Sequence, residues 1–159
     1  MGNWIEAGTP APAFTLTADD GTKVRLSEQK GNPVVLYFYP KDDTPGCTRE
    51  ACAFRDAQTK LKRLGVQLYG LSPDDVGSHA RFRDKFNLNF PLLADPGHKV
   101  AEKYGAWREK NMYGKKTMGI QRSTFLIDTA GKVAKVWKRV RVDGHDQQVL
   151  EAVATLVSK

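Results

Sequence analysis

The sequence predicts an α/β domain built around a mixed β-sheet, and three observations lead to this prediction. The chain has 159 residues, so it is long enough to bury ~68–70% of its unfolded surface without disulfide or metal staples. Short apolar runs typical of strands alternate with segments that carry apolar residues at helical spacing. A pair of short strands and a closing helix then end the chain, which is an order typical of α/β proteins. Because no repeat or linker composition interrupts the pattern, we expect residues 1–159 to form a single domain.

The first third of the chain predicts a β-hairpin followed by a buried strand. Polarity alternates in residues 14–17 and 24–26, on either side of Asp20-Gly21, and this is a strong hairpin signal. The apolar run Pro33–Tyr39 is typical of a central strand that is buried on both faces, and Pro40 ends it.

A long helix is expected to start at Thr44. Threonine is a common N-cap residue, and Pro45 suits the first helical position. Apolar residues follow at helical spacing until Gly65, which is expected to end the helix. We therefore expect the Thr44 side chain to cap the first turn.

The rest of the chain completes a thioredoxin-like plan. Residues 105–119 contain Gly, Lys and Met without periodicity, so we expect a loop there. The other elements expected are a strand over 66–71, a helix up to about residue 86, a short strand over 91–94, a short helix over 96–104, a hairpin made by 123–128 and 133–138, and a helix over 147–156. This order agrees with a thioredoxin-like fold that has a mixed central sheet, an N-terminal β-hairpin and an inserted segment.

Charge and composition narrow the class of protein. The net charge of +7 allows an acidic partner such as nucleic acid, but ordinary solubility explains it as well. The basic residues of 132–141 are the best nucleic-acid candidate, and we expect them to be the solvated face of a hairpin strand. No run approaches the ~18 apolar residues of a membrane span, and no secretory signal is visible. We therefore expect a cytoplasmic protein that binds neither membranes nor nucleic acid.

Neither a metal nor an organic cofactor is expected. His79, His98 and His145 are far apart in the sequence and lack the spacing of metal ligands. The glycines form neither a Walker-type nor a Rossmann-type phosphate-binding pattern.

The chemistry is expected at the two cysteines, which are too few for a disulfide framework. If Thr44 is the N-cap, Cys47 is the third residue of the helix, where free N–H groups and the helix dipole stabilise a thiolate. Gly46 leaves room for a small substrate beside the sulfur. The alternative is that Cys47 is a small buried apolar residue, as most free cysteines are. Cys52 is too far from Cys47 for a Cys-x-x-Cys site. By itself it is better explained as a buried core cysteine, whereas a reactive Cys47 nearby favours a resolving role.

Residues 40–52 read Pro-x-x-x-Thr-Pro-Gly-Cys-Thr-x-Glu-x-Cys, and this pattern resembles the peroxiredoxins. Specifically, it resembles the peroxiredoxin Q or bacterioferritin-comigratory-protein (Bcp) branch. The similarity extends to residues 11–16, to Tyr37–Pro40 and to Arg122–Asp128, so it covers nearly the whole chain. The resemblance implies a thiol peroxidase that reduces hydrogen peroxide and organic hydroperoxides and serves in antioxidant defence.

The resemblance also implies roles for residues around the sulfur. Cys47 would be the peroxidatic nucleophile, and Pro40 would shield it. The Thr44 hydroxyl and the Arg122 guanidinium would hydrogen-bond the thiolate and the peroxide oxygens, and Glu50 would orient Arg122. Arginine suits this task because it stays charged and offers several donors in a rigid fork.

The resemblance implies that Cys52 resolves the Cys47 sulfenic acid as an intramolecular disulfide. An external donor, thioredoxin or a glutaredoxin-type protein, would then reduce that disulfide, and the basic residues of 132–141 would be able to steer an acidic thioredoxin. The enzyme would be an atypical two-cysteine peroxiredoxin, expected to be a monomer that needs no cofactor.

The sequence also allows two other functions, a general thiol–disulfide oxidoreductase and a binding module that is not an enzyme. A general thiol–disulfide oxidoreductase is disfavoured because Cys-x-x-Cys is absent and because Thr44 and Arg122 are present. The second is a basic nucleic-acid or chaperone-like binding module, whose binding would survive the loss of both cysteines.

Overall fold

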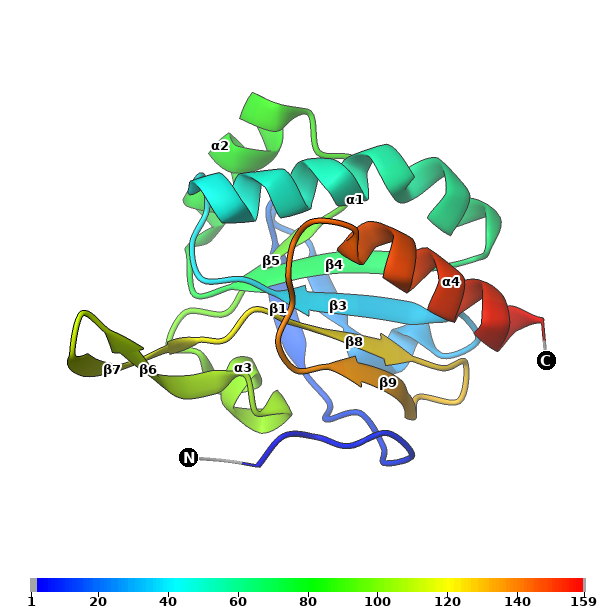
Figure 1. Ribbon diagram of the computed structural model, residues 1–159. Coiled ribbons are helices and arrows are strands. Elements are labelled where there is room, and N and C mark those ends of the chain that lie inside the picture. The colour runs from blue at the N-terminus through cyan, green and yellow to red at the C-terminus, as the bar shows by residue number, and fades with distance from the viewer. Residues whose placement is uncertain (1–2, 159) are drawn as a thin grey trace.

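The computed structural model describes residues 3–158, which form a seven-stranded sheet with helices on both faces and a separate two-stranded ribbon (Figure 1). The elements are β1 (Thr15–Ala18), β2 (Lys23–Arg25), the 3₁₀ helix η1 (Leu26–Gln29), β3 (Val34–Phe38), α1 (Pro45–Arg63), β4 (Gln67–Ser72), α2 (Val76–Phe86), β5 (Leu92–Ala94), α3 (Lys99–Tyr104), β6 (Trp107–Met112), β7 (Lys115–Ile120), β8 (Ser123–Ile127), β9 (Val133–Trp137) and α4 (His145–Val157). The strand order in the large sheet is β2-β1-β5-β4-β3-β8-β9.

The sheet is mixed and has β3 near its centre. β3 pairs parallel with β4 and antiparallel with β8, and every residue of β3 is buried. A strand buried on both faces needs an apolar sequence without alternation, which is what the run before Pro40 provides. The expected mixed sheet, the N-terminal hairpin of β1 and β2 and the late hairpin of β8 and β9 are all confirmed.

Two apolar clusters cover the two faces of this sheet. One face packs against α1, α2 and α4, and the other packs against α3, η1 and the N-terminal segment (Figure 1). In the part of the chain that the structure describes, no helix combines the length and the apolar character that a membrane span needs.

The start of α1 differs from the expectation in one respect. Thr44 is the N-cap residue and Pro45 follows it, but the predicted side-chain cap is wrong. The Thr44 hydroxyl donates to the carbonyl of Lys41 at 2.9 Å, so a local turn competes successfully with the helix for it. The first turn of α1 therefore has no side-chain cap, and its N–H groups have no partner within the helix.

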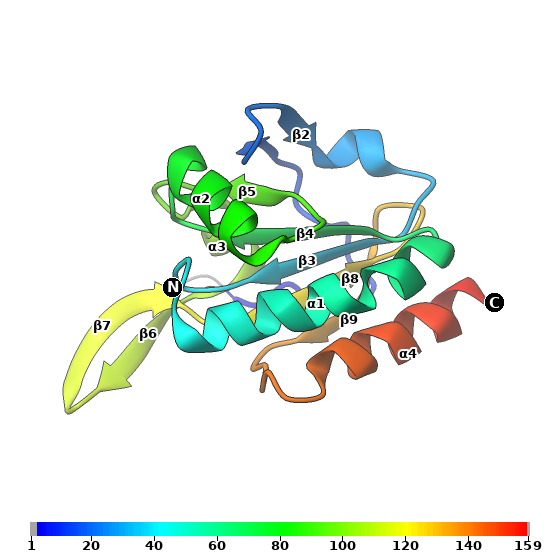
Figure 2. The same cartoon turned by 90° about the horizontal axis from the view of Figure 1, so that it is seen from above.

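The loop expected over residues 105–119 is wrong, because β6 and β7 form a β-hairpin there. Its turn residues Tyr113 and Gly114 both have positive φ, which matches the twist of a two-residue hairpin turn. The hairpin projects from the body of the molecule (Figure 2). The side chains of β7 are exposed from Lys115 to Met118. Most residues of the ribbon are exposed or only partly buried, so an alternation of apolar residues is not needed and the sequence carries no strand signal.

Gly70 accommodates the Tyr37 side chain in the middle of the sheet. The two residues are neighbours on β4 and β3, and the Tyr37 ring stacks on Phe54 of α1 with centroids 4.8 Å apart. A Cβ atom on Gly70 would lie 2.8 Å from the phenol carbon and oxygen of Tyr37 and 3.0 Å from Leu92. Only a glycine fits at this position without moving the rings.

We therefore expect Gly70→Ala to lower the free energy of unfolding by about 1–3 kcal/mol, because overpacking a rigid core forces side chains out of their rotamers. Urea unfolding measures the change. Gly119→Ala is the matched control, because its Cβ would lie 3.5 Å from the flexible Lys110 side chain, which is an ordinary contact. Equal stability of the two variants would contradict this account of the core.

Candidate active site

The start of α1 places Cys47 in a buried position at the edge of the sheet. Cys47 is the third residue of α1 and is 2% exposed. It follows the connection between β3 and α1, so it lies near the C-terminal end of β3. Both Cys47 and Cys52 are free thiols. The sulfur thus lies at an uncapped helix start, which stabilises an anion, but it is also buried, so a thiolate there needs a nearby donor to replace water.

Arg122 provides that donor. It immediately precedes β8, whose first residue Ser123 pairs with Phe38 at the end of β3. This register brings Arg122 to the same end of the sheet as Cys47. Its Nη2 donates to Cys47 Sγ at 3.2 Å, and its Nη1 donates to Glu50 Oε1 at 2.7 Å. One guanidinium therefore joins the sulfur to a carboxylate.

Glu50 is one helical turn after Cys47, and its side chain is 2% exposed. Burial raises the pKa of Glu50 from 4.5 to about 7, although the charge and the hydrogen bond of Arg122 act in the opposite direction. Burial also lowers the pKa of Arg122, but the charges of Glu50 and Cys47 outweigh it and leave that pKa above its usual value. Arg122 is therefore a permanent cation held between two acceptors.

The other predicted site residues surround this contact more loosely. Gly46 allows the close approach of Arg122, since a Cβ there would lie 3.2 Å from Nη2. Pro40 is partly buried at the start of the connection between β3 and α1. The Thr44 hydroxyl donates to Lys41 and not to the sulfur. Cys52 is partly exposed on the same helix and lies outside the Cys47–Arg122–Glu50 contact.

Two residues near the site were missed by the sequence analysis. Burial raises the pKa of Tyr37 well above its usual value, and the charges of Glu50 and Cys47 contribute to the rise. On β6, burial and the charge of Arg122 lower the pKa of Lys110. Tyr37 belongs to a segment that resembles the family, but its type and its place in an apolar run suggest only a core residue, and Lys110 lies in a hairpin that was not predicted.

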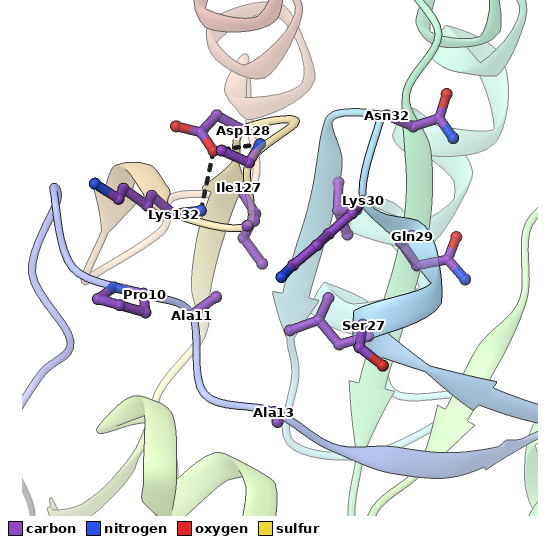
Figure 3. A pocket seen from close by; sticks show the side chains of 14 residues that line it. Pro10, Ala11, Ala13, Ser27, Gln29, Lys30, Asn32, Ile127, Asp128 and Lys132 are labelled. Carbon is purple, nitrogen blue, oxygen red and sulfur yellow. Dashed lines mark hydrogen bonds between the residues drawn. The ribbon is translucent and has the colours of Figure 1, made fainter.

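A separate pocket lies far from this site. It has a volume of about 330 Å³ and includes Val34 and Ile127, which pair at the start of β3. Figure 3 shows it between the N-terminal segment at Pro10 and Ala11 and the segment around Lys30. Cys47 lies at the opposite end of β3, so this pocket is not part of the site.

Comparison with known proteins identifies the family. Residues 7–136 match the AhpC/TSA family. The chain belongs to this family. Its sequence is 51% identical to the putative peroxiredoxin bcp of Coxiella burnetii, over 92% of this chain and 97% of the relative. It is 46% identical to the peroxiredoxin Bcp of Bacillus subtilis, over 98% and 99% of the two chains.

Solved structures agree with this assignment. A structure of Xanthomonas campestris peroxiredoxin Q superimposes with a TM-score of 0.90 at 38% identity, covering 95% of this chain and 98% of that one. The resemblance to the peroxiredoxin Q or Bcp branch and the thioredoxin-like fold are therefore confirmed. As an AhpC/TSA peroxiredoxin, the chain is a thiol-dependent peroxidase, which uses a peroxide substrate and a thiol reductant.

The raised pKa of Glu50 predicts a pH dependence of stability. The folded protein binds a proton on Glu50 between about pH 4.5 and pH 7, where the unfolded chain has lost it. This contribution to stability is complete below pH 4.5 and is lost as the pH rises through about 7. Glu50→Gln keeps an acceptor for Arg122 but does not titrate. The difference in unfolding free energy between wild type and Glu50→Gln should therefore fall over this range, by at most about 1.4 kcal/mol per pH unit, and then level off. Urea unfolding at several pH values measures it, and a difference that grows with pH would contradict the assignment.

Proposed function

We propose that Cys47 reduces hydrogen peroxide and organic hydroperoxides to water and alcohols, and that Cys52 resolves the oxidised sulfur. The observation that carries this proposal is the Arg122 guanidinium, which contacts Cys47 Sγ at 3.2 Å beside the uncapped start of α1. One solved relative, a Xanthomonas campestris bacterioferritin comigratory protein, is described in connection with alkyl peroxide reduction, and it is 37% identical to this chain. That description supports including organic hydroperoxides among the substrates.

In the peroxide step, the Cys47 thiolate attacks one oxygen of the peroxide, and the O–O bond breaks. The sulfur becomes a sulfenic acid, while the departing oxygen takes up the electron pair and a proton to give water or an alcohol. Negative charge thus moves from sulfur to the departing oxygen. The Arg122 fork and the first-turn N–H groups of α1 lie on this path, and a fixed donor of this kind lowers a barrier by ~3–4 kcal/mol.

We propose supporting roles for the other three residues. The Thr44 hydroxyl would turn from Lys41 to a peroxide oxygen when the substrate binds, since rotation about one side-chain bond redirects it. Pro40 would limit the access of water to the sulfur. Glu50, in contact with Arg122 at 2.7 Å, would keep the guanidinium aimed at Cys47.

In the resolving step, the Cys52 thiol condenses with the Cys47 sulfenic acid to form a disulfide and water. A dithiol protein of the thioredoxin or glutaredoxin type would then supply two electrons and two protons to restore both thiols. We propose that this cycle runs in a reducing compartment, the cytoplasm, and in a monomer.

The main experiment compares Cys47→Ser with Cys52→Ser. NADPH consumption is measured with thioredoxin and its reductase, with a parallel glutaredoxin arm, against hydrogen peroxide and several organic hydroperoxides. Cys47→Ser should lose at least a thousandfold in peroxide reduction, because a serine hydroxyl is not ionised at neutral pH. Cys52→Ser should react once with peroxide at the wild-type rate and then stop as a sulfenic acid. A Cys47→Ser protein that keeps a tenth of the turnover would refute the role of Cys47. A Cys52→Ser protein that cycles normally would show that another thiol resolves the sulfenic acid.

The resolving step requires α1 to change shape. Residues five apart in a helix have Cα atoms about 8.6 Å apart and point to different faces, whereas a disulfide spans roughly 4.4–6.8 Å. We therefore expect about residues 42–55 to unwind or be remodelled on oxidation. Amide hydrogen exchange should show protection over this segment in the reduced enzyme and its loss in the oxidised one. Equal protection in both forms, with the disulfide confirmed by mass spectrometry, would show that no unwinding occurs.

A further inference from the structure

The connection between β3 and α1 carries residues that the proposed function places around the sulfur. It runs from Tyr39 to Thr44 and includes Pro40, and Asp43 adopts a left-handed conformation with φ of 56°. A shift of this short segment would move Pro40 and Thr44 relative to Cys47. The contacts that fix this segment therefore affect the rate of the peroxide reaction.

Asp42 ties the connection to α2. Its carboxylate accepts hydrogen bonds from the Tyr39 hydroxyl at 2.5 Å and the Ser78 hydroxyl at 2.7 Å. The same carboxylate lies 2.7 Å from Nδ1 of His79. The backbone N–H of Asp42 donates to Asp74 Oδ2 at 2.8 Å. The middle of the connection is thus attached by its main chain and its side chain at once.

His79 is the buried partner in this arrangement, and each of its ring nitrogens faces an acceptor. The side chain is fully buried, and that of Asp42 is 4% exposed. Nε2 lies 3.0 Å from the carbonyl of Leu93, which can only accept a hydrogen bond. Nδ1 faces a carboxylate that already accepts from two hydroxyls. Each acceptor favours a ring N–H on the nitrogen that faces it, and the short 2.7 Å contact is typical of a hydrogen bond to a charged carboxylate.

A metal ion is not the better explanation of this cluster. Single ligand atoms of Asp42, Asp74 and His79 lie within 4.8 Å of one another, a spacing that metal sites also show. A metal would need a free lone pair on His79, but both nitrogens are already bonded. The cluster is a set of hydrogen bonds that are satisfied without a metal.

We propose that His79 is a positioning residue for the peroxide reaction. Its imidazole ring, held by the Leu93 carbonyl, fixes Asp42 and thereby places Pro40 and Thr44 against Cys47 before the substrate arrives. This proposal rests on the peroxide chemistry proposed for Cys47. A misplacement of about 1 Å in a reacting arrangement lowers a rate by up to ~100-fold, so an anchor outside the site affects the chemistry.

The test uses His79→Asn in a Cys52→Ser background, where Cys47 is the one remaining thiol. Two rates are measured: single-turnover oxidation of Cys47 by hydrogen peroxide, and its alkylation by iodoacetamide, which needs neither Pro40 nor Thr44. The ratio of the peroxide rate to the alkylation rate should fall at least tenfold. A merely structural role of His79 would lower both rates together, or neither, and an unchanged ratio would overturn the proposal.

His145→Asn is the matched control. His145 is also buried, bonds to Thr124 and Gln148, and lies against Phe54 of α1, but it has none of these contacts with the 39–44 connection. The ratio of rates should change less than threefold in this variant. An equal fall in both histidine variants would show a general loss of packing around α1 and would overturn the proposal.

The partner of His79 supplies a second test. In an Asp42→Asn background the His79 ring has no carboxylate to hold, so adding His79→Asn should change the ratio less than threefold. An undiminished tenfold effect there would overturn the proposal.

Should His79→Asn fail to fold, Ser78→Ala is the second variant. It removes one of the Asp42 hydrogen bonds and keeps the contact between Asp42 and His79. It should lower the ratio about threefold, and no change would overturn the proposal. A parent protein whose Cys47 reacts with peroxide no faster than free cysteine would instead refute the proposed function itself.

Discussion

The Arg122 guanidinium, bonded at once to Cys47 and Glu50, is the contact on which the site depends. Cys47 and Glu50 are three residues apart on α1, so both side chains lie on the face that meets the start of β8. A carboxylate as deeply buried as Glu50 needs a cation, and a buried guanidinium needs an acceptor, because either charge alone would be strongly destabilising. The pair thus locks a helix on one side of the sheet to the beginning of a strand within it, and the sulfur lies where they meet.

The same helix that holds Cys47 separates it from Cys52. A position in the first turn gives the sulfur its donors, yet residues five apart on an intact helix cannot form a disulfide. The enzyme must therefore use two arrangements of one segment, and the cost of changing between them has to be small. The Asp42–His79 pair holds the connection just before α1. It therefore lies at the boundary between the start of α1, which has to change shape, and the sheet, which stays in place.

The sequence and the structure agree where burial and local motifs decide the outcome. The apolar run that ends at Pro40 predicted β3, and the Thr44–Cys52 motif predicted the start of α1 and the residues that meet there. The β6–β7 hairpin could not be predicted, because a ribbon whose residues are mostly exposed or partly buried has no alternating pattern. The contact of Asp42 with His79 could not be predicted either, since the two residues are 37 positions apart, one in the connection before α1 and the other on α2.

The Arg122 contact also links the chemistry of the sulfur to the stability of the helix. The Cys47 thiolate places a full negative charge beside the Arg122 cation, whereas a neutral sulfenic acid offers that cation only a hydrogen-bond acceptor, so oxidation removes the charge–charge part of the contact. If Cys47 reacts as proposed, conversion of the thiolate to a neutral sulfenic acid weakens the bond that holds the first turns of α1. A loss of about 1 kcal/mol shifts a local opening equilibrium roughly fivefold toward the open form. Arg122 keeps its bond to Glu50 throughout, so the open form does not leave the guanidinium without a partner. Oxidation itself would then favour the unwinding that brings Cys47 to Cys52, and reduction would restore the contact that closes the site.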